Sequence, residues 1–127
     1  FNIHHHLHAT RRSVNMSERL RRNATLLKAL HRSAPIARKR LLRAHCSPDF
    51  INCISECCKN VLKGNVRLTP SQKASLRRRR NTLHLVSLKS TSQKRKKKLI
   101  QSGGFLGALL GPIISVISGL FGGGGGK

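Results

Sequence analysis

The chain has 127 residues, with 26 Lys and Arg against 3 Asp and Glu, and its formal net charge is +23. The three acidic residues, Glu18, Asp49 and Glu56, are too few and too scattered to form a carboxylate pair for acid–base catalysis, so we do not expect an enzyme. So large an uncompensated charge predicts an external polyanion as the partner, and nucleic acid is the first candidate.

Aromatic residues give no support for base stacking. Trp and Tyr are absent, and the four Phe are not interleaved with the lysines and arginines. Stacking of single-stranded bases on aromatic rings is therefore not expected. Contact with the phosphate backbone, without sequence preference, remains as the mode of binding.

Residues 1–15 hold a histidine group and show no apolar period. We expect the native product to start at Met16, with residues 1–15 as an upstream or disordered segment. A transition metal bound by the histidines would be held weakly outside a folded context, and the sequence predicts neither a metal ion nor a cofactor. The group consists of His4, His5, His6 and His8.

Residues 16–45 are rich in Arg, Leu and Ala, and they predict two basic amphipathic helices. Ser17 is placed to cap the first helix, and Ser33 with Pro35 separates it from the second. The cations of the second helix are candidate nucleic-acid contacts: Arg38, Lys39, Arg40 and Arg43.

Residues 46–88 predict a helical hairpin that forms a small core. Its first helix, 48–63, has Ser47 as N-cap, Pro48 in the first turn, a broad apolar stripe, and Gly64 as a left-handed stop. These signals together define the best-marked element of the chain.

The second helix of the hairpin begins where Thr69 and Gln72 have the spacing of a capping box, with Pro70 between them. We expect it to run to about Leu88 and to pack against the first helix, because the connection between them is short. Its cations are the next candidate nucleic-acid contacts: Lys73, Arg77, Arg78, Arg79 and Arg80.

Four cysteines lie close together in this region. Because the basic clusters are typical of a nuclear protein, reduced thiols are favoured over a disulfide framework. A zinc site is the alternative, but no Cys-x-x-Cys pair is present, so small hydrophobic core residues are the preferred interpretation. The cysteines are Cys46, Cys53, Cys57 and Cys58, with His45 beside them.

Residues 89–98 predict a linker that ends in a solvated basic run. This run and the arginine cluster before it also have the pattern of a bipartite nuclear-import signal. Its five residues complete the candidate nucleic-acid contacts: Lys94, Arg95, Lys96, Lys97 and Lys98.

Residues 99–121 carry no charge, and a glycine tail, 122–127, follows them. The apolar stretch is short for a membrane span and contains glycines and Pro112, so we interpret it as a membrane-active segment of the fusion-peptide type. A plug that docks on a capsid protein and a conventional anchor are the alternatives.

Small residues at every fourth position predict a ridge for close helix approach, for example by a second copy of the chain: Gly103, Gly107, Gly111, Ser115 and Gly119. The candidate residues for membrane contact or self-association are Phe105, Gly107, Gly111, Ser115, Gly119 and Phe121.

The order of these parts resembles a protein encoded by polintons and adintoviruses, the counterpart of adenovirus core protein X (mu). Three stretches carry the resemblance: 54–66 (Ile-Ser-Glu-Cys to Gly-Asn-Val), 68–73 (Leu-Thr-Pro-Ser-Gln-Lys), and the basic run followed by Gly-Gly-Phe-Leu at 103–106. The resemblance implies a late virion component that condenses the genome and helps the particle to cross a membrane. Residues 120–123, Leu-Phe-Gly-Gly, are also similar to the cleavage pattern of adenovirus-type proteases, which implies processing after Gly123.

The sequence thus predicts an all-α protein with a small helical hairpin, basic and partly disordered flanks, and a C-terminal hydrophobic, glycine-rich helix. The expected function is non-specific binding and condensation of viral or transposon DNA, in the virion and the host nucleus. A membrane-lytic or fusion-like protein and a capsid-docking cement peptide are the alternatives. The expected partner is DNA, and a membrane, a capsid protein and a second copy of the chain are the further candidates.

Overall fold

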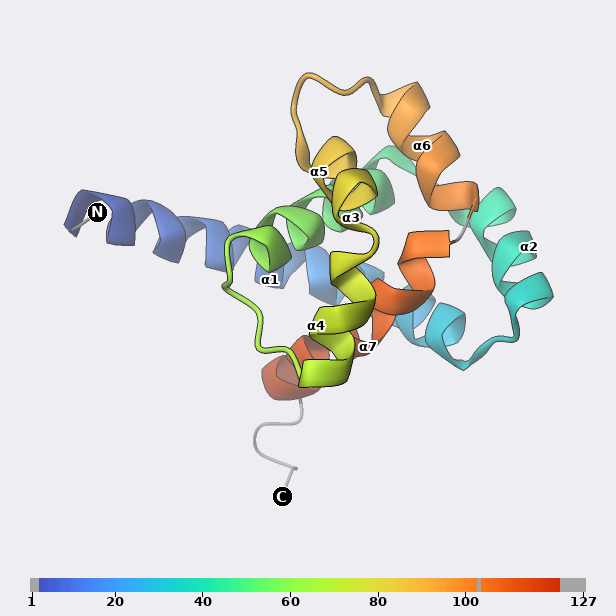
Figure 1. Ribbon diagram of the computed structural model, residues 1–127, viewed down its shortest axis with the longest axis horizontal. Helices are drawn as coiled ribbons and strands as arrows, with labels where there is room; N and C mark the ends of the chain where they lie inside the picture. Colours follow the sequence, from blue (N-terminus) through green and yellow to red (C-terminus); the bar gives the residue numbers. More distant parts are fainter. Residues whose placement is uncertain (1–2, 103, 122–127) are drawn as a thin grey trace.

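The computed structural model describes residues 3–102 and 104–121, and the side chains of 18–102 and 104–119. This part contains seven helices and no strand, so the prediction of an all-α protein is confirmed (Figure 1). The helices are α1 (Ile3–Arg32), α2 (Pro35–His45), α3 (Pro48–Leu62), α4 (Pro70–Arg77), α5 (Arg80–Ser87), α6 (Gln93–Ser102) and α7 (Gly104–Phe121).

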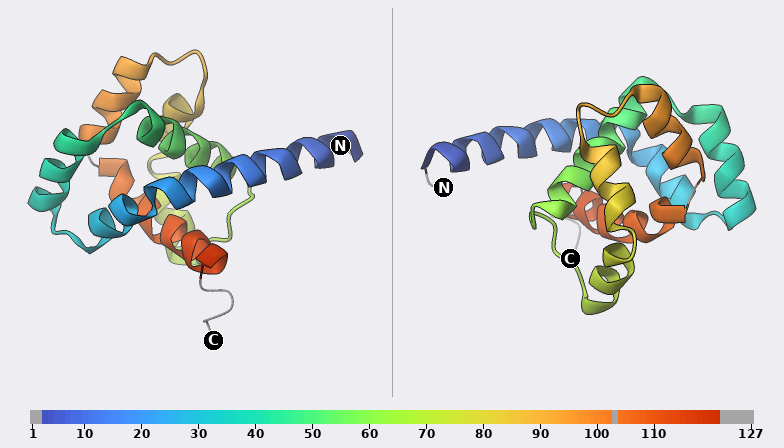
Figure 2. Two further views of the ribbon diagram at one scale, coloured as in Figure 1. Left: turned by 180° about the vertical axis from the view of Figure 1, so that it is seen from behind. Right: turned by 45° about the horizontal axis from the view of Figure 1, so that its top comes forward.

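Helix α1 runs through Ser17 without a break, so the predicted helix start at that residue is wrong. The stretch before Ser17 contains neither Pro nor Gly, and therefore nothing in it stops the helix. The predicted break after Ser33 is confirmed, because α1 ends at Arg32 and α2 begins at Pro35. The first turns of α1 project beyond the other helices (Figures 1 and 2).

Helix α3 follows its sequence signals closely. The Ser47 hydroxyl accepts a hydrogen bond from the backbone N–H of Phe50 at 3.1 Å, and Pro48 occupies the first turn. Gly64, two residues after the end of α3, has a φ of +81°, which an L side chain rarely adopts. The predicted start and stop of this helix are both confirmed.

The capping box before α4 is also confirmed. The Thr69 hydroxyl accepts from the Gln72 N–H at 3.1 Å, while the Thr69 N–H donates to Gln72 Oε1 at 3.0 Å. The helix does not continue to Leu88, however, because it breaks at Arg78 and Arg79 into α4 and α5. The two pieces pack on different partners, α4 on α7 and α5 on α3, and one straight helix could not reach both. The hairpin partner of α3 is therefore α5.

Helix α6 occupies part of the segment that was expected to be a linker. The Ser92 hydroxyl accepts from the Arg95 N–H at 3.1 Å and so caps the helix, and the lysines and arginine that follow are good helix formers. Ile100 anchors the helix to the core with no exposed surface. Only the residues between α5 and α6 form the connection.

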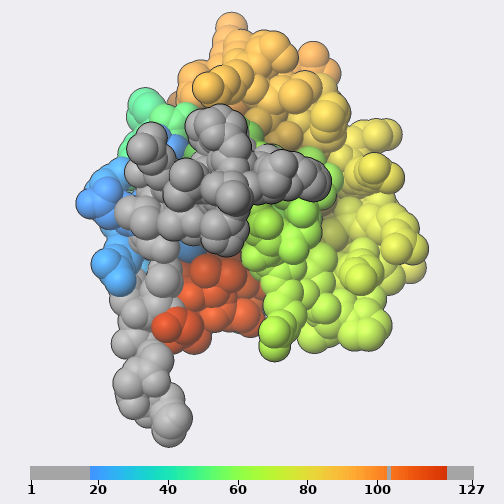
Figure 3. Space-filling model, turned by 90° about the vertical axis from the view of Figure 1, so that its left-hand side faces the viewer, coloured from blue at the N-terminus to red at the C-terminus, as the bar shows by residue number. Residues whose placement is uncertain are grey.

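One hydrophobic core joins the helices, and it extends from Leu20 to Ile117 rather than being confined to residues 46–88. Helix α7 packs against both α1 and α4. Figure 3 shows its surface (red) between those of α1 (blue) and the region of α4 (light green). The uncharged C-terminal segment is thus an inner element of the fold. The buried residues of α7 are Phe105, Leu106, Leu109, Leu110, Pro112, Ile113 and Ile117.

Candidate nucleic-acid interface

Helix α2 presents cations on its outer side. Leu42 is the one fully buried side chain of α2, and the Leu42 carbonyl accepts a hydrogen bond from Gln101 of α6 at 3.4 Å. This contact fixes α2 beside α6 and turns the opposite face of α2 to solvent. Three predicted contacts are exposed there: Lys39, Arg40 and Arg43.

Helix α6 presents a second group of cations. Ile100 and Lys96 face inward, and the two side chains on either side of Lys96 point outward. The exposed predicted contacts of this helix are Lys94, Arg95, Lys97 and Lys98.

The bend between α4 and α5 presents the third group. Leu76 before the bend and Leu83 after it are buried, so each helix is held from one side while the residues between them face solvent. The bend therefore displays its arginines more openly than a straight helix would. The exposed predicted contacts here are Lys73, Arg77, Arg78, Arg79 and Arg80.

The helices that carry the three groups lie around the first turns of α7, since α6 contacts α2, α5 and α7, and α4 contacts α7. A Cβ atom added at Gly104 would lie 3.5 Å from Nη1 of Arg79, and one added at Gly107 would lie 3.0 Å from Nη1 of Arg38. The arginine bend and α2 therefore approach the same end of α7, which Figure 1 shows among α2, α4 and α6. The start of a long helix adds a positive partial charge at this place. We call the twelve exposed cations of α2, the bend and α6 the basic surface.

The acidic residues are placed elsewhere, on α1 and α3. Asp49 pairs with Arg22 at 3.0 Å, and Glu56 lies 3.7 Å from Arg19. The hydrogen bond from Arg22 holds the pKa of the Asp49 carboxyl below its usual value, and the same bond raises the pKa of Arg22. In the described part of the chain, neither ion pair includes a cation of the basic surface.

Two predicted contacts have structural roles. Arg38 is half-buried, and its guanidinium donates to the Leu30 carbonyl at 3.0 Å and to the Ser33 carbonyl at 3.2 Å. The Leu30 carbonyl also accepts from the Ser33 N–H at 3.3 Å, and the Ser33 carbonyl lies one residue after α1, so Arg38 adds hydrogen bonds at the C-terminal end of that helix. Contact of Arg38 with nucleic acid stays a prediction.

At Lys96 the prediction of a solvated basic run is wrong, because this side chain is only 5% exposed. Its ammonium group donates to the Ser55 hydroxyl at 3.1 Å. Burial lowers the pKa of Lys96, and the nearby charge of Lys59 lowers it further. Sequence reasoning missed Ser55, and the only available signal was a polar residue on the apolar stripe of α3.

The residues assigned to membrane contact or self-association lie in several environments. Phe105 is buried, while Gly107 and Gly111 face polar side chains of Arg38 and Gln72. Ser115 and Gly119 are exposed, and Gly107 is exposed as well, so the ridge is not covered along its described length. Gly103, the Phe121 side chain and the cleavage pattern at Gly123 fall outside the described residues.

No single helix in the described ranges has both the length and the apolar character to cross a bilayer. Helices α6 and α7 pass that test only as a pair, and they meet at an angle of 87°. A membrane role for 99–121 therefore stays a prediction, and it would require α7 to leave the core.

All four cysteines are free thiols with buried side chains. Burial raises the pKa of Cys46 and of Cys58, and a hydrogen bond with Cys53 together with burial raises the pKa of Cys57. Among the side chains that the structure describes, no three His, Cys, Asp or Glu residues come together as metal ligands. The cysteines thus pack as small core residues.

In comparisons with known proteins, no protein-family model, no curated protein and no solved structure matched this chain.

Proposed function

We propose that this protein binds nucleic acid through backbone phosphates, without reading base sequence, and that the basic surface makes the contacts. The observation that carries the proposal is the meeting of three cation-bearing elements around the start of α7, while the carboxylates lie on α1 and α3. Like charges that crowd together without internal partners repel one another, and an ordered row of phosphates relieves that repulsion.

Phosphate is the favoured ligand because of the kind of side chain on the basic surface. Lysine and arginine contact phosphate oxygens without sequence information, whereas base reading needs an element that fits a groove and places a few side chains on base edges. The basic surface spans three short helices and a bend, and each part contributes charge. We therefore expect affinity without sequence preference.

The test is the salt dependence of binding to short duplexes, measured by fluorescence anisotropy. A protein that covers about six to ten phosphates loses roughly a thousandfold or more in affinity between about 50 and 200 mM salt. Two duplexes of unrelated sequence should give equal affinities. An affinity that does not change with salt contradicts the proposal.

A charge-matched pair of variants tests the location of the interface. Replacement of Lys94, Lys97 and Lys98 by Gln removes three cations of α6, and the same change at Lys63, Arg67 and Lys89 removes three exposed cations elsewhere. The salt slope is the slope of the logarithm of the binding constant against the logarithm of the salt concentration. It should fall by about three units in the α6 variant and by much less in the control variant. Equal losses in both variants would mean that net charge alone, rather than the basic surface, governs binding.

The resemblance to the polinton and adintovirus protein supports the wider setting of this proposal. In that setting the chain condenses viral or transposon DNA in the nucleus and the virion. Mass spectrometry of purified particles tests this, because it detects the protein in the particle and also reports its termini, including a start at Met16 or a cut after Gly123.

A further inference from the structure

A groove with an apolar floor runs beside the end of α3. Leu62, the last residue of α3, is 37% exposed, and Ile36 is the one other large hydrophobic residue exposed among the described side chains. Leu62 separates two depressions and lines both of them. We call these two depressions the α3–α5 groove.

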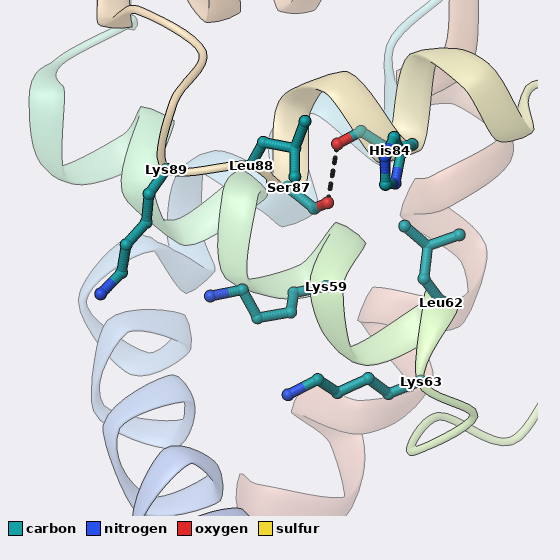
Figure 4. Close-up of a pocket in the computed structure, with 7 residues that line it drawn as sticks. All are labelled: Lys59, Leu62, Lys63, His84, Ser87, Leu88 and Lys89. Atoms are coloured by element: carbon teal, nitrogen blue, oxygen red, sulfur yellow. Dashed lines mark hydrogen bonds between the residues drawn. The ribbon is translucent and has the colours of Figure 1, made fainter.

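The first depression has a volume of about 400 Å³ and lies between the ends of α3 and α5 (Figure 4). Leu62 and Leu88 supply its apolar lining. In Figure 4 the side chains of Lys59, Lys63 and Lys89 extend to one side of it, away from Leu62 and His84. The depression thus has a cationic side and an apolar side.

The second depression, of about 190 Å³, lies between α3, α4 and α5. Apolar side chains of all three helices line it, including Val61, Leu76 and Leu83. The cations Lys73, Arg77 and Arg80 line it as well. This is space for one or two aliphatic side chains, next to positive charge.

We propose that the α3–α5 groove binds an acidic peptide segment that carries apolar anchor residues. Carboxylates of the segment pair with the lysines and arginines of the groove, and its anchors fill the depressions on either side of Leu62. None of the described side chains that line the two depressions is a carboxylate, so the positive charge there lacks a partner within the lining.

Other occupants lack the required chemistry. A DNA duplex offers phosphates and sugars on a convex surface, without aliphatic groups for the depressions, and the lining holds no Phe, Tyr or Trp on which an unpaired base could stack, only the imidazole of His84. A second copy of this chain supplies no acidic segment, since it has three scattered acidic residues, and Asp49 and Glu56 are already paired. The occupant is therefore a different, acidic protein.

The groove shares Lys73, Arg77 and Arg80 with the basic surface, whereas Leu62 and Lys63 belong to the groove alone. An acidic peptide in the groove therefore competes with phosphate along this edge. Substitutions of Leu62 and Lys63 therefore test the groove separately from DNA binding.

The experiment uses the full-length protein and a fluorescein-labelled peptide of glutamates with two leucines one helical turn apart. A matched peptide carries serine in place of leucine and has the same charge. Anisotropy titrations at physiological salt should show about tenfold tighter binding of the leucine peptide, because burial of an aliphatic side chain contributes about that much. Equal affinities of the two peptides would show charge attraction only and overturn the proposal.

Three variants locate the site. Leu62→Ser should abolish the preference for the leucine peptide, and Ile36→Ser, the same change at an exposed residue outside the groove, should retain it. Lys63→Glu should weaken binding of both peptides, and it provides a second test if the Leu62 variant does not fold. A preference that survives Leu62→Ser, or that disappears equally in Ile36→Ser, assigns the peptide to another surface and rejects the groove.

Discussion

The Lys96 ammonium group donates a hydrogen bond to the Ser55 hydroxyl at 3.1 Å, and that hydroxyl in turn donates to the Val86 carbonyl at 2.8 Å. The pair joins α6 to α3, and the bond to Val86 joins α3 to α5. The Ser55 hydroxyl thus provides a hydrogen-bond partner to both a buried ammonium group and a backbone carbonyl. Loss of a buried partner is costly when the groups around it stay buried.

We expect Ser55→Ala to lower the free energy of unfolding by about 1–3 kcal/mol, since both Lys96 and the Val86 carbonyl lose their partner. Urea denaturation followed by circular dichroism measures the change. Ser102→Ala is the control, because that hydroxyl is exposed, and its effect should stay within about 0.5 kcal/mol. Similar losses at the two positions would contradict the role assigned to Ser55.

Lys96 and Lys97 provide a matched pair for DNA binding, because they are neighbours of equal charge and opposite exposure. Lys97→Gln should lower the salt slope by about one unit, and Lys96→Gln should leave it nearly unchanged. Anisotropy titrations with the same duplex measure both. A larger loss at Lys96 would place that residue in contact with phosphate and reverse our correction.

Arg38 and Arg40 form a second matched pair, on α2. Arg38→Ala removes the hydrogen bonds at the end of α1 and should lower the free energy of unfolding by about 1–2 kcal/mol with little change in DNA affinity. Arg40→Ala should do the reverse, because Arg40 is exposed and belongs to the basic surface. Thermal denaturation and DNA titrations of both variants distinguish the two roles.

Alkaline pH should destabilise the protein through its buried thiols. The pKa values of Cys46, Cys57 and Cys58 are raised above the ordinary 9.0 in the folded state. Their contribution to the free energy of unfolding is therefore fully present below pH 9 and is lost as the pH rises beyond it. Lys96 acts in the opposite direction, because burial lowers its pKa from 10.5. The free-energy cost of burying the charged ammonium group disappears as the pH rises and the group loses its proton.

The measurement is the free energy of unfolding between about pH 8 and 10 under reducing conditions, in a Lys96→Met background that removes the opposing contribution. We expect a decline with pH in this background and a shallower one after Cys58→Ala is added. Parallel curves for the two proteins would show that the Cys58 thiol titrates alike in the folded and unfolded states.

Leakage of anionic vesicles tests the membrane prediction for residues 99–121. Leu110 has no exposed surface, and Leu110→Ala should lower the free energy of unfolding by about 2–5 kcal/mol. If α7 must leave the core before it inserts, the variant should release more trapped dye than the wild-type protein at equal concentration. Equal leakage by the two proteins would show that release of α7 is not required.

Local signals in the sequence were enough to predict α3 and the start of α4. Ser47, Gly64, Thr69 and Gln72 act within a few residues of their own positions, so the caps form as expected. The solvent exposure of Lys39, Arg40 and Arg43 and of the arginine bend was also predictable, because a charged side chain without a partner remains in solvent.

The bend at Arg79 and the burial of Lys96 were missed because both depend on contacts between distant parts of the chain. The bend at Arg79 exists because α4 and α5 pack on different helices, and Lys96 is buried because α6 lies against Ser55. Composition alone marked residues 99–121 as a membrane segment, since a buried core helix and a membrane segment are equally apolar. Only the positions of α1 and α4 decide that α7 lies inside.

The contact between α1 and α7 also has a consequence for synthesis. These helices are the first and the last of the described elements to leave the ribosome, so the apolar face of α1 stays without its partner until α7 has been made. The core can therefore close only after α7 has been synthesised. A product that stops before α7 would retain an open, highly cationic chain with unburied leucines, which is the kind of molecule that chaperones and proteases remove.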